Sequence, residues 1–131
     1  MTSRAALLLI ALLLAGCASA GPQGPLEPLV VGTEQLFALD WQAEPRDASN
    51  VVVWGYAVNR SPYTFDRLRL LVDALGPDGQ LVSQRLIWAP GLLGSWGRTY
   101  FEAPMPPATA YRVRVFSYDR VEGGFPRDRL W

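Results

Sequence analysis

The sequence predicts an all-β protein, built either as a sandwich of two antiparallel sheets or as a small barrel. Three observations favour this fold class. Apolar and polar residues alternate with a period of two in several segments, as in strands that bury one face. Gly, Pro, Asp and Asn residues that favour turns separate these segments. After residue 16, no segment of useful length shows the periodicity of an amphipathic helix.

Residues 1–16 have the organisation of a secretory signal peptide. Arg4 supplies a basic start, and an unbroken run of ten apolar residues extends over residues 5–14. This run is well short of the ~20 residues that a membrane-spanning helix needs. We therefore expect residues 1–16 to be removed during export.

The only cysteine, Cys17, directly follows Leu14-Ala15-Gly16. This stretch resembles the lipobox of bacterial lipoproteins. The resemblance implies cleavage before Cys17 and acylation of that residue, and two or more acyl chains anchor a protein stably to a membrane. The alternative is a plain signal peptide ending at residues 18–20, with Cys17 incidental. In a Gram-negative source, Ala18 in place of Asp implies the outer membrane, with the domain facing the periplasm.

The rest of the chain divides into a tether and one domain. Residues 17–28 are rich in Gly, Pro and Ala and carry one charge, at Glu27, so we interpret them as a lipidated flexible tether. Residues 29–131 then form the β-sandwich domain, which is long enough for one modest core.

Alternation and β-propensity predict the strands of this domain. The predicted strands are residues 37–42, 51–59, 67–74, 81–88, 99–103 and 111–118. Residues 44–50, 60–63 and 89–97 are predicted loops, and Pro104, Pro106 and Pro107 are expected to end the fifth strand. In the last strand, alternation sets Arg112, Arg114, Phe116 and Tyr118 apart from Tyr111, Val113, Val115 and Ser117.

A tight turn joins the third and fourth predicted strands into a hairpin. Its sequence is Gly76-Pro77-Asp78-Gly79, in which Pro fixes φ at the first corner and Gly supplies a positive φ. Asp78 is a single carboxylate beside a glycine, so we interpret it as a turn residue rather than a calcium ligand.

Several spaced residues carry a family resemblance. They are Val53-x-Gly55-x-Ala57-x-Asn59, Leu68-x-Leu70-x-Val72, Asp78-Gly79-x-Leu81-Val82, Pro90-Gly91 and Tyr111-x-Val113-x-Val115. Over residues 30–120 this pattern resembles the FxLYD-type immunoglobulin-like domains of bacterial envelope lipoproteins, which are similar to the sandwiches of late-embryogenesis-abundant water-stress proteins. The resemblance implies an immunoglobulin-like antiparallel β-sandwich of about seven strands, with Val53, Gly55 and Ala57 facing inward and no shared catalytic residues.

Composition argues against catalysis and nucleic-acid binding. Twelve basic residues balance twelve acidic ones, so no basic surface excess attracts a polyanion. The chain has no His and no Lys, which removes His-dependent nucleophiles, Schiff bases and most zinc sites. We therefore expect no enzyme activity, no metal and no cofactor. A small hydrolase with paired carboxylates is the least favoured alternative.

Aromatic and apolar residues are the remaining candidates for binding a partner. If Val53 and Ala57 face inward, Trp54 and Tyr56 face outward, as Arg69, Arg112, Arg114 and Phe116 also do by the same alternation. We favour the interpretation that such a stripe is self-contained through cation–π stacking, and the alternative is a surface for a glycan or a protein.

The loop of residues 91–97 is the second candidate, because it places Leu92, Leu93 and Trp96 among three glycines. Either this loop is an apolar contact site, or Leu92 and Leu93 fold down to plug the open end of the sandwich, which we favour slightly. Trp96 distinguishes the two, because Trp is enriched in binding hot spots.

Taken together, these features predict a lipid-anchored periplasmic lipoprotein that acts by binding. We expect a non-catalytic accessory module of an envelope protein complex, held to the membrane by its N-terminal lipid. The alternative is a glycan- or peptidoglycan-binding module.

Overall fold

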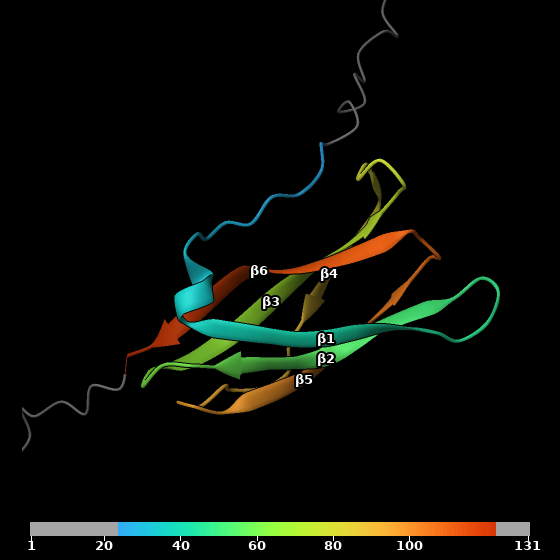
Figure 1. Ribbon diagram of the computed structural model, residues 1–131. Helices are drawn as coiled ribbons and strands as arrows, with labels where there is room; N and C mark the ends of the chain where they lie inside the picture. Colours follow the sequence, from blue (N-terminus) through green and yellow to red (C-terminus); the bar gives the residue numbers. More distant parts are fainter. Residues whose placement is uncertain (1–23, 123–131) are drawn as a thin grey trace, which may run out of the picture.

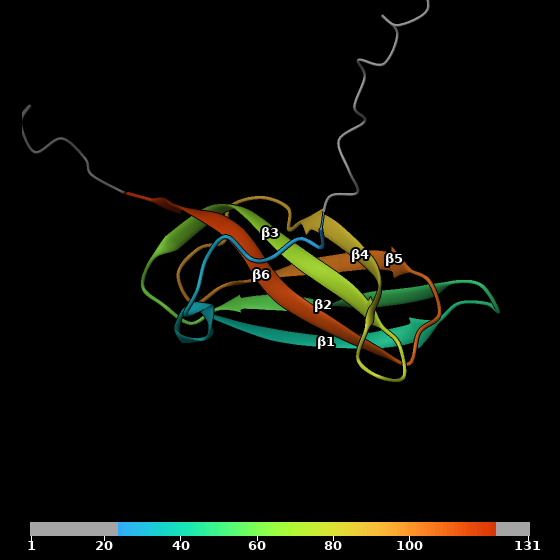
Figure 2. The same ribbon diagram turned by 90° about the horizontal axis from the view of Figure 1, so that it is seen from above.

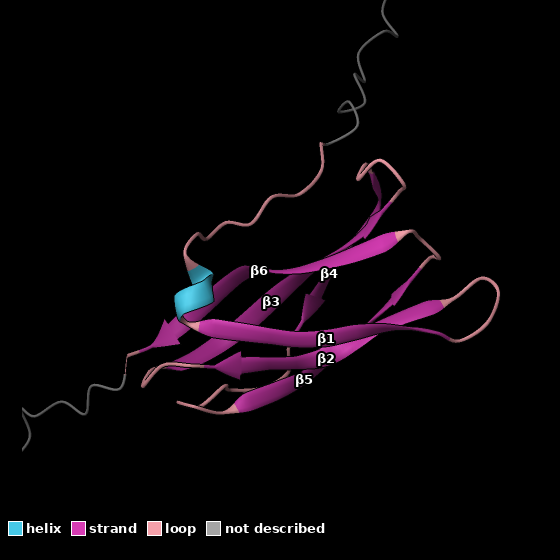
Figure 3. Cartoon of the chain, viewed as in Figure 1, coloured by secondary structure: helices cyan, strands magenta, loops and turns pink. Residues whose placement is uncertain are grey.

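Two three-stranded antiparallel sheets pack face to face in the computed structural model, which describes residues 24–122 (Figures 1 and 3). Sheet A has the order β1-β2-β5, and sheet B has the order β4-β3-β6. This arrangement confirms the predicted antiparallel β-sandwich, with six strands in the described residues rather than about seven. No helix within residues 24–122 is long and apolar enough to cross a membrane.

The strand bounds follow the sequence pattern closely. Sheet A contains β1 (Phe37–Pro45), β2 (Val51–Asn59) and β5 (Arg98–Met105), and sheet B contains β3 (Thr64–Leu75), β4 (Leu81–Trp88) and β6 (Ala110–Val121). A three-residue 3-10 helix, η1 (Thr33–Gln35), precedes β1. The turn at residues 76–79 joins β3 to β4 as predicted, and Gly79 adopts the expected positive φ of 75°.

The inward faces of the two sheets form one hydrophobic core. Val53 and Ala57 on β2 are fully buried there, so the inward phase predicted for this strand is confirmed. The other buried members come from β1, β3, β5, β6 and the β4–β5 connection, whereas β4 contributes only the half-buried Ile87. They include Phe37, Phe65, Leu68, Leu70, Val72, Phe101, Val113 and Val115. Gly55 lies where β1 approaches most closely, because a Cβ there would overlap the carbonyl oxygen of Asp40.

Four strands extend further than the sequence pattern predicts: β3 begins at Thr64, β6 continues to Val121, and β1 and β5 are also longer. β1 continues to Pro45, because Glu44 and Pro45 still pair with Val52 and Val51 of β2. β5 continues through Pro104, which was expected to end it. Because β5 is an edge strand of sheet A, a residue without an N–H is tolerated there.

A β-bulge corrects the predicted phase of β6. Leu70 pairs with Val115 but its neighbour Arg69 pairs with Ser117, so β6 carries an extra residue at this point. Tyr118 therefore packs against the core, with its ring centroid 5.3 Å from Phe37. Ser117 moves to the outer face, where its Oγ accepts a hydrogen bond of 2.8 Å from Arg69 Nε.

Residues 24–32, which we call the N-terminal strap, run along the outer side of sheet B (Figures 1 and 2). Leu26 N donates to Gln84 Oε1 on β4 at 2.7 Å, and Leu26 O accepts from Gln84 Nε2 at 3.0 Å. Further along, Leu29 N donates to the carbonyl oxygen of Phe116 on β6 at 2.9 Å. The docked part of the chain therefore begins at or before Leu26, inside the segment predicted as tether.

A fully buried carboxylate, Asp73 on the central strand β3, lies next to this strap. Its Oδ1 accepts from Gln84 Nε2 at 2.9 Å. Its Oδ2 accepts from Arg112 Nε and Nη2 at 3.0 and 2.8 Å, and from Arg114 Nη2 at 2.9 Å. Gln84 and Arg112 are the direct cross-strand neighbours of Asp73, so strand register places the network.

This network generates a stability prediction. Asp73→Ala should lower the free energy of unfolding by about 3 kcal/mol, because it leaves two arginines without their shared carboxylate. Urea denaturation of the protein measures this change in the free energy of unfolding. Asp78→Ala in the exposed β3–β4 turn is the control and should cost less than about 0.5 kcal/mol. Equal effects of the two substitutions would contradict a structural role for Asp73.

Candidate binding surfaces

The connection between β4 and β5 contains two very different leucines. Leu93 is buried in the core, and its N and O exchange hydrogen bonds of 2.8 and 2.9 Å with the backbone of Phe65. Leu92 is 66% exposed, and Trp96 is 67% exposed. The plug interpretation therefore holds for Leu93 alone. Leu93 is not available to a partner, which corrects its place among the contact candidates.

A buried amide, Asn59, holds this connection in place. Asn59 Nδ2 donates to the carbonyl oxygens of Tyr63 at 2.6 Å and Gly94 at 2.9 Å. Its Oδ1 accepts from Ser61 N at 3.0 Å and from Ser61 Oγ at 2.7 Å. Asn59 thus joins the β2–β3 loop to the β4–β5 connection.

Sequence reasoning assigned no role to Asn59, although a signal was present. Asn59 occupies the inward phase of β2 behind Val53, Gly55 and Ala57. A polar side chain in that phase must be hydrogen-bonded when it is buried, because an unpaired amide in the core is costly. An Asn at the end of an apolar face therefore indicates a loop held by its side chain.

The backbone of Trp96 is strained. Its φ is +60°, in the left-handed region that a bulky side chain rarely adopts. Trp96 N donates to Ser61 O at 3.3 Å, and the next residue, Gly97, donates to Gly94 O at 3.0 Å. The connection therefore presents an exposed indole in a conformation that costs free energy, a combination that is associated with functional sites.

An aromatic surface covers the outer face of sheet A. Trp54 and Tyr56 on β2 face outward as predicted, and Tyr100 on β5 joins them because it pairs directly with Tyr56. The ring centroid of Tyr100 lies 6.3 Å from Trp54 and 5.7 Å from Tyr56. We call these three rings the aromatic platform. Tyr100 was not a sequence candidate, since its role depends on the β2–β5 register.

Charged and polar groups surround the aromatic platform. Trp54 Nε1 donates to Glu44 Oε2 at 3.0 Å, and Arg98 Cζ lies 4.3 Å from the centroid of the Tyr56 ring. Tyr100 Oη donates to Glu102 Oε2 at 2.9 Å, and this hydrogen bond raises the pKa of Tyr100 above its ordinary value. The arginines expected to stack with these rings, Arg69, Arg112 and Arg114, lie on sheet B instead, because β3 and β6 belong to the other sheet. Arg98 on β5 makes the cation–π contact, and Tyr100 remains exposed.

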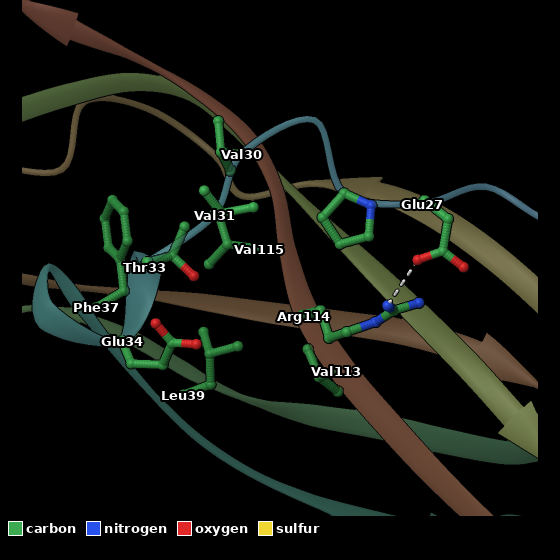
Figure 4. Close-up of a pocket in the computed structure, with 12 residues that line it drawn as sticks. Glu27, Val30, Val31, Thr33, Glu34, Phe37, Leu39, Val113, Arg114 and Val115 are labelled. Carbon is green, nitrogen blue, oxygen red and sulfur yellow. Dashed lines mark hydrogen bonds and ion pairs between the residues drawn. The ribbon is translucent and has the colours of Figure 1, made fainter.

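A cleft of about 540 Å³ lies between the strap and the edges of β1 and β6 (Figure 4). Its apolar lining includes Val30, Val31, Phe37, Leu39, Val113 and Val115. An ion pair of 3.2 Å between Glu27 Oε2 and Arg114 Nη1 lies at its rim. The strap forms one side of this cleft, which the sequence pattern did not predict.

The remaining sequence predictions concern lipidation and metal binding. Cys17 lies outside the described residues. Within residues 24–122, no group of three or more acidic, His or Cys side chains is placed to hold a metal ion. Comparisons with known protein families, curated proteins and solved structures found no match. The case for function therefore depends on the surfaces of the chain itself.

The strain at Trp96 generates a prediction. Trp96→Gly should raise the free energy of unfolding by about 1 kcal/mol, because glycine adopts the left-handed conformation without a Cβ clash. Trp96→Ala keeps the strain and should change stability little, since the indole is mostly exposed. Urea titration of both variants separates the backbone effect from side-chain packing. A clear loss of stability in both would mean that the indole is a packing element.

Proposed function

We propose that this protein is a lipid-anchored, periplasm-facing, non-catalytic accessory module of an envelope protein complex. Its contact with a protein partner is made by Leu92 and Trp96 in the β4–β5 connection. The observation that carries this proposal is the exposed indole of Trp96 on a strained backbone. Cys17 in its lipobox-like context supports the anchor, and the outer membrane is the proposed location in a Gram-negative source.

The physics of recognition favours this connection as a contact. Trp side chains are enriched among the residues that dominate binding energy. The buried Asn59 network holds the connection before any partner arrives, so binding loses little conformational entropy. Leu92 adds a second exposed apolar side chain four positions away.

The aromatic platform supports a second candidate function, binding of a glycan such as peptidoglycan. Its rings offer flat apolar surface on which sugar rings can stack. Glu44 and Glu102 supply carboxylate oxygens beside those rings that can accept hydrogen bonds from sugar hydroxyls. A hollow of about 240 Å³ between Trp54 and Tyr56 gives the surface some depth.

The anchor is tested by Cys17→Ser. Without the thiol, acylation and lipoprotein processing should fail, so the chain should accumulate as an unprocessed precursor. Mass spectrometry of the mature N-terminus and metabolic labelling with palmitate measure the outcome. A Cys17→Ser chain that still matures and remains in the membrane fraction would refute the lipobox.

The two binding functions are separated by one pair of variants. A photo-crosslinking residue at position 92 should give a discrete protein adduct in intact envelopes, and Trp96→Ala should remove it with little change in melting temperature. Position 78, in the opposite turn, is the control for non-specific adducts. Trp54→Ala should leave the adduct intact.

The glycan candidate predicts the converse pattern. Wild-type protein would then be retained on isolated sacculi and released by soluble muropeptides, and Trp54→Ala would lose this retention. Absence of an adduct at position 92 together with such retention would replace the first function by the second.

A further inference from the structure

We infer that the strap side of sheet B rests on an anionic lipid surface, so that the aromatic platform on sheet A points away from the membrane. This inference depends on the proposed acylation of Cys17 and deepens it. Acylation alone fixes where the chain is tied, whereas the strap determines which face of the domain is turned toward the bilayer.

The position of the strap supplies the first argument. The chain enters the domain on the outer side of sheet B, opposite sheet A (Figure 1). Leu26 is hydrogen-bonded to Gln84, which in turn contacts the buried Asp73 at the centre of that sheet. Cys17 precedes Leu26 by nine positions, so even a fully extended chain spans only about 30 Å between them. The strap therefore keeps sheet B close to the lipid.

Exposed apolar side chains on this side supply the second argument. Leu29 and Val31 on the strap are 69% and 94% exposed, and Trp88 at the end of β4 is 61% exposed. Leu29 and Trp88 line the same hollow beside Arg69, although they lie 59 positions apart in the sequence. Trp and aliphatic side chains of this kind favour the headgroup–acyl boundary of a bilayer.

The distribution of charge supplies the third argument. The strap side of sheet B has Arg67, Arg69, Arg112 and Arg114 against Glu27, Asp66, Asp73 and Asp119, which is four positive charges against four negative ones. The outer face of sheet A has Arg98 against Asp40, Glu44 and Glu102, which is one against three. Anionic headgroups therefore repel sheet A, whereas sheet B carries no net charge that opposes contact with them.

One arginine is especially suited to a phosphate. Arg69 lies between two rings, with Cζ 5.1 Å from the centroid of Trp88 and 5.0 Å from that of Phe116. Its Nε donates to Ser117 Oγ, and no carboxylate within the described residues pairs with it. The guanidinium thus keeps donors for a lipid phosphate at the point where Trp88 enters the interface.

Depth measurement on the full-length acylated protein tests this orientation. Because acylation blocks Cys17, the only native cysteine, Val31→Cys and Gln42→Cys each provide one thiol for a nitroxide label. Gln42 is exposed on the outer face of sheet A and is the matched control. The protein is reconstituted into vesicles of phosphatidylethanolamine and phosphatidylglycerol. Collision rates with oxygen and with a water-soluble nickel chelate then report depth.

The inference predicts that the label at position 31 is shielded from the nickel chelate and accessible to oxygen, while the label at position 42 shows the reverse. Leu29→Cys provides a second site on the strap and should match position 31. Replacing phosphatidylglycerol by phosphatidylcholine should move both strap labels toward water.

The possible failures are distinguishable. Water-like collision rates at positions 29 and 31, in protein that still floats with the vesicles, would overturn the orientation and leave the lipid anchor intact. Equal shielding at positions 31 and 42 would also overturn it. Protein that carries no acyl group and does not float would overturn the anchor and the orientation together.

Discussion

The arrangement of sheet B depends on the hydrogen bonds and ion pairs that the buried carboxylate of Asp73 makes. It accepts hydrogen bonds from one side chain on β4 and from two on β6, so all three strands share one charged group. The carboxylate needs both arginines, because an uncompensated buried charge costs several kcal/mol. Through Gln84 the same network holds Leu26, and through Arg114 it holds Glu27. A polar network on the outer face of a sheet thereby fixes the entry of the chain into the domain.

Asn59 has the corresponding function at one end of the sandwich. Its amide hydrogen-bonds to backbone groups of both the β2–β3 loop and the β4–β5 connection, in addition to the Trp96 N to Ser61 O hydrogen bond that also joins them. The result is a connection in which Leu93 belongs to the core while Leu92 and Trp96 remain exposed. A buried amide outside the connection therefore helps to hold Trp96 in place, together with the backbone hydrogen bonds of Leu93, Trp96 and Gly97.

The sequence predicted best those features of the fold that are determined within a single segment. β2 and β4 have the predicted bounds, and β2 has the inward phase that the family resemblance implied. Features that depend on two distant segments were not predictable in this way. The β6 bulge needs the pairing of Arg69 with Ser117, the platform needs Tyr100 to lie beside Tyr56, and the docking of the strap needs Gln84. Of the candidate residues, Trp54, Tyr56, Leu92 and Trp96 lie on the surface and Leu93 does not.

The two sheets also differ in what their outer faces offer. Sheet B carries the strap, equal numbers of arginines and carboxylates and scattered exposed apolar side chains, whereas sheet A carries clustered aromatic rings with an excess of carboxylates. If the two outer faces of the domain were alike, it would make no difference which face the strap contacts. Here the strap is bonded to one face, so the proposed N-terminal anchor would turn the other face away from the membrane. The Asp73 network would thus couple the proposed anchoring of the chain to the direction in which its aromatic platform points.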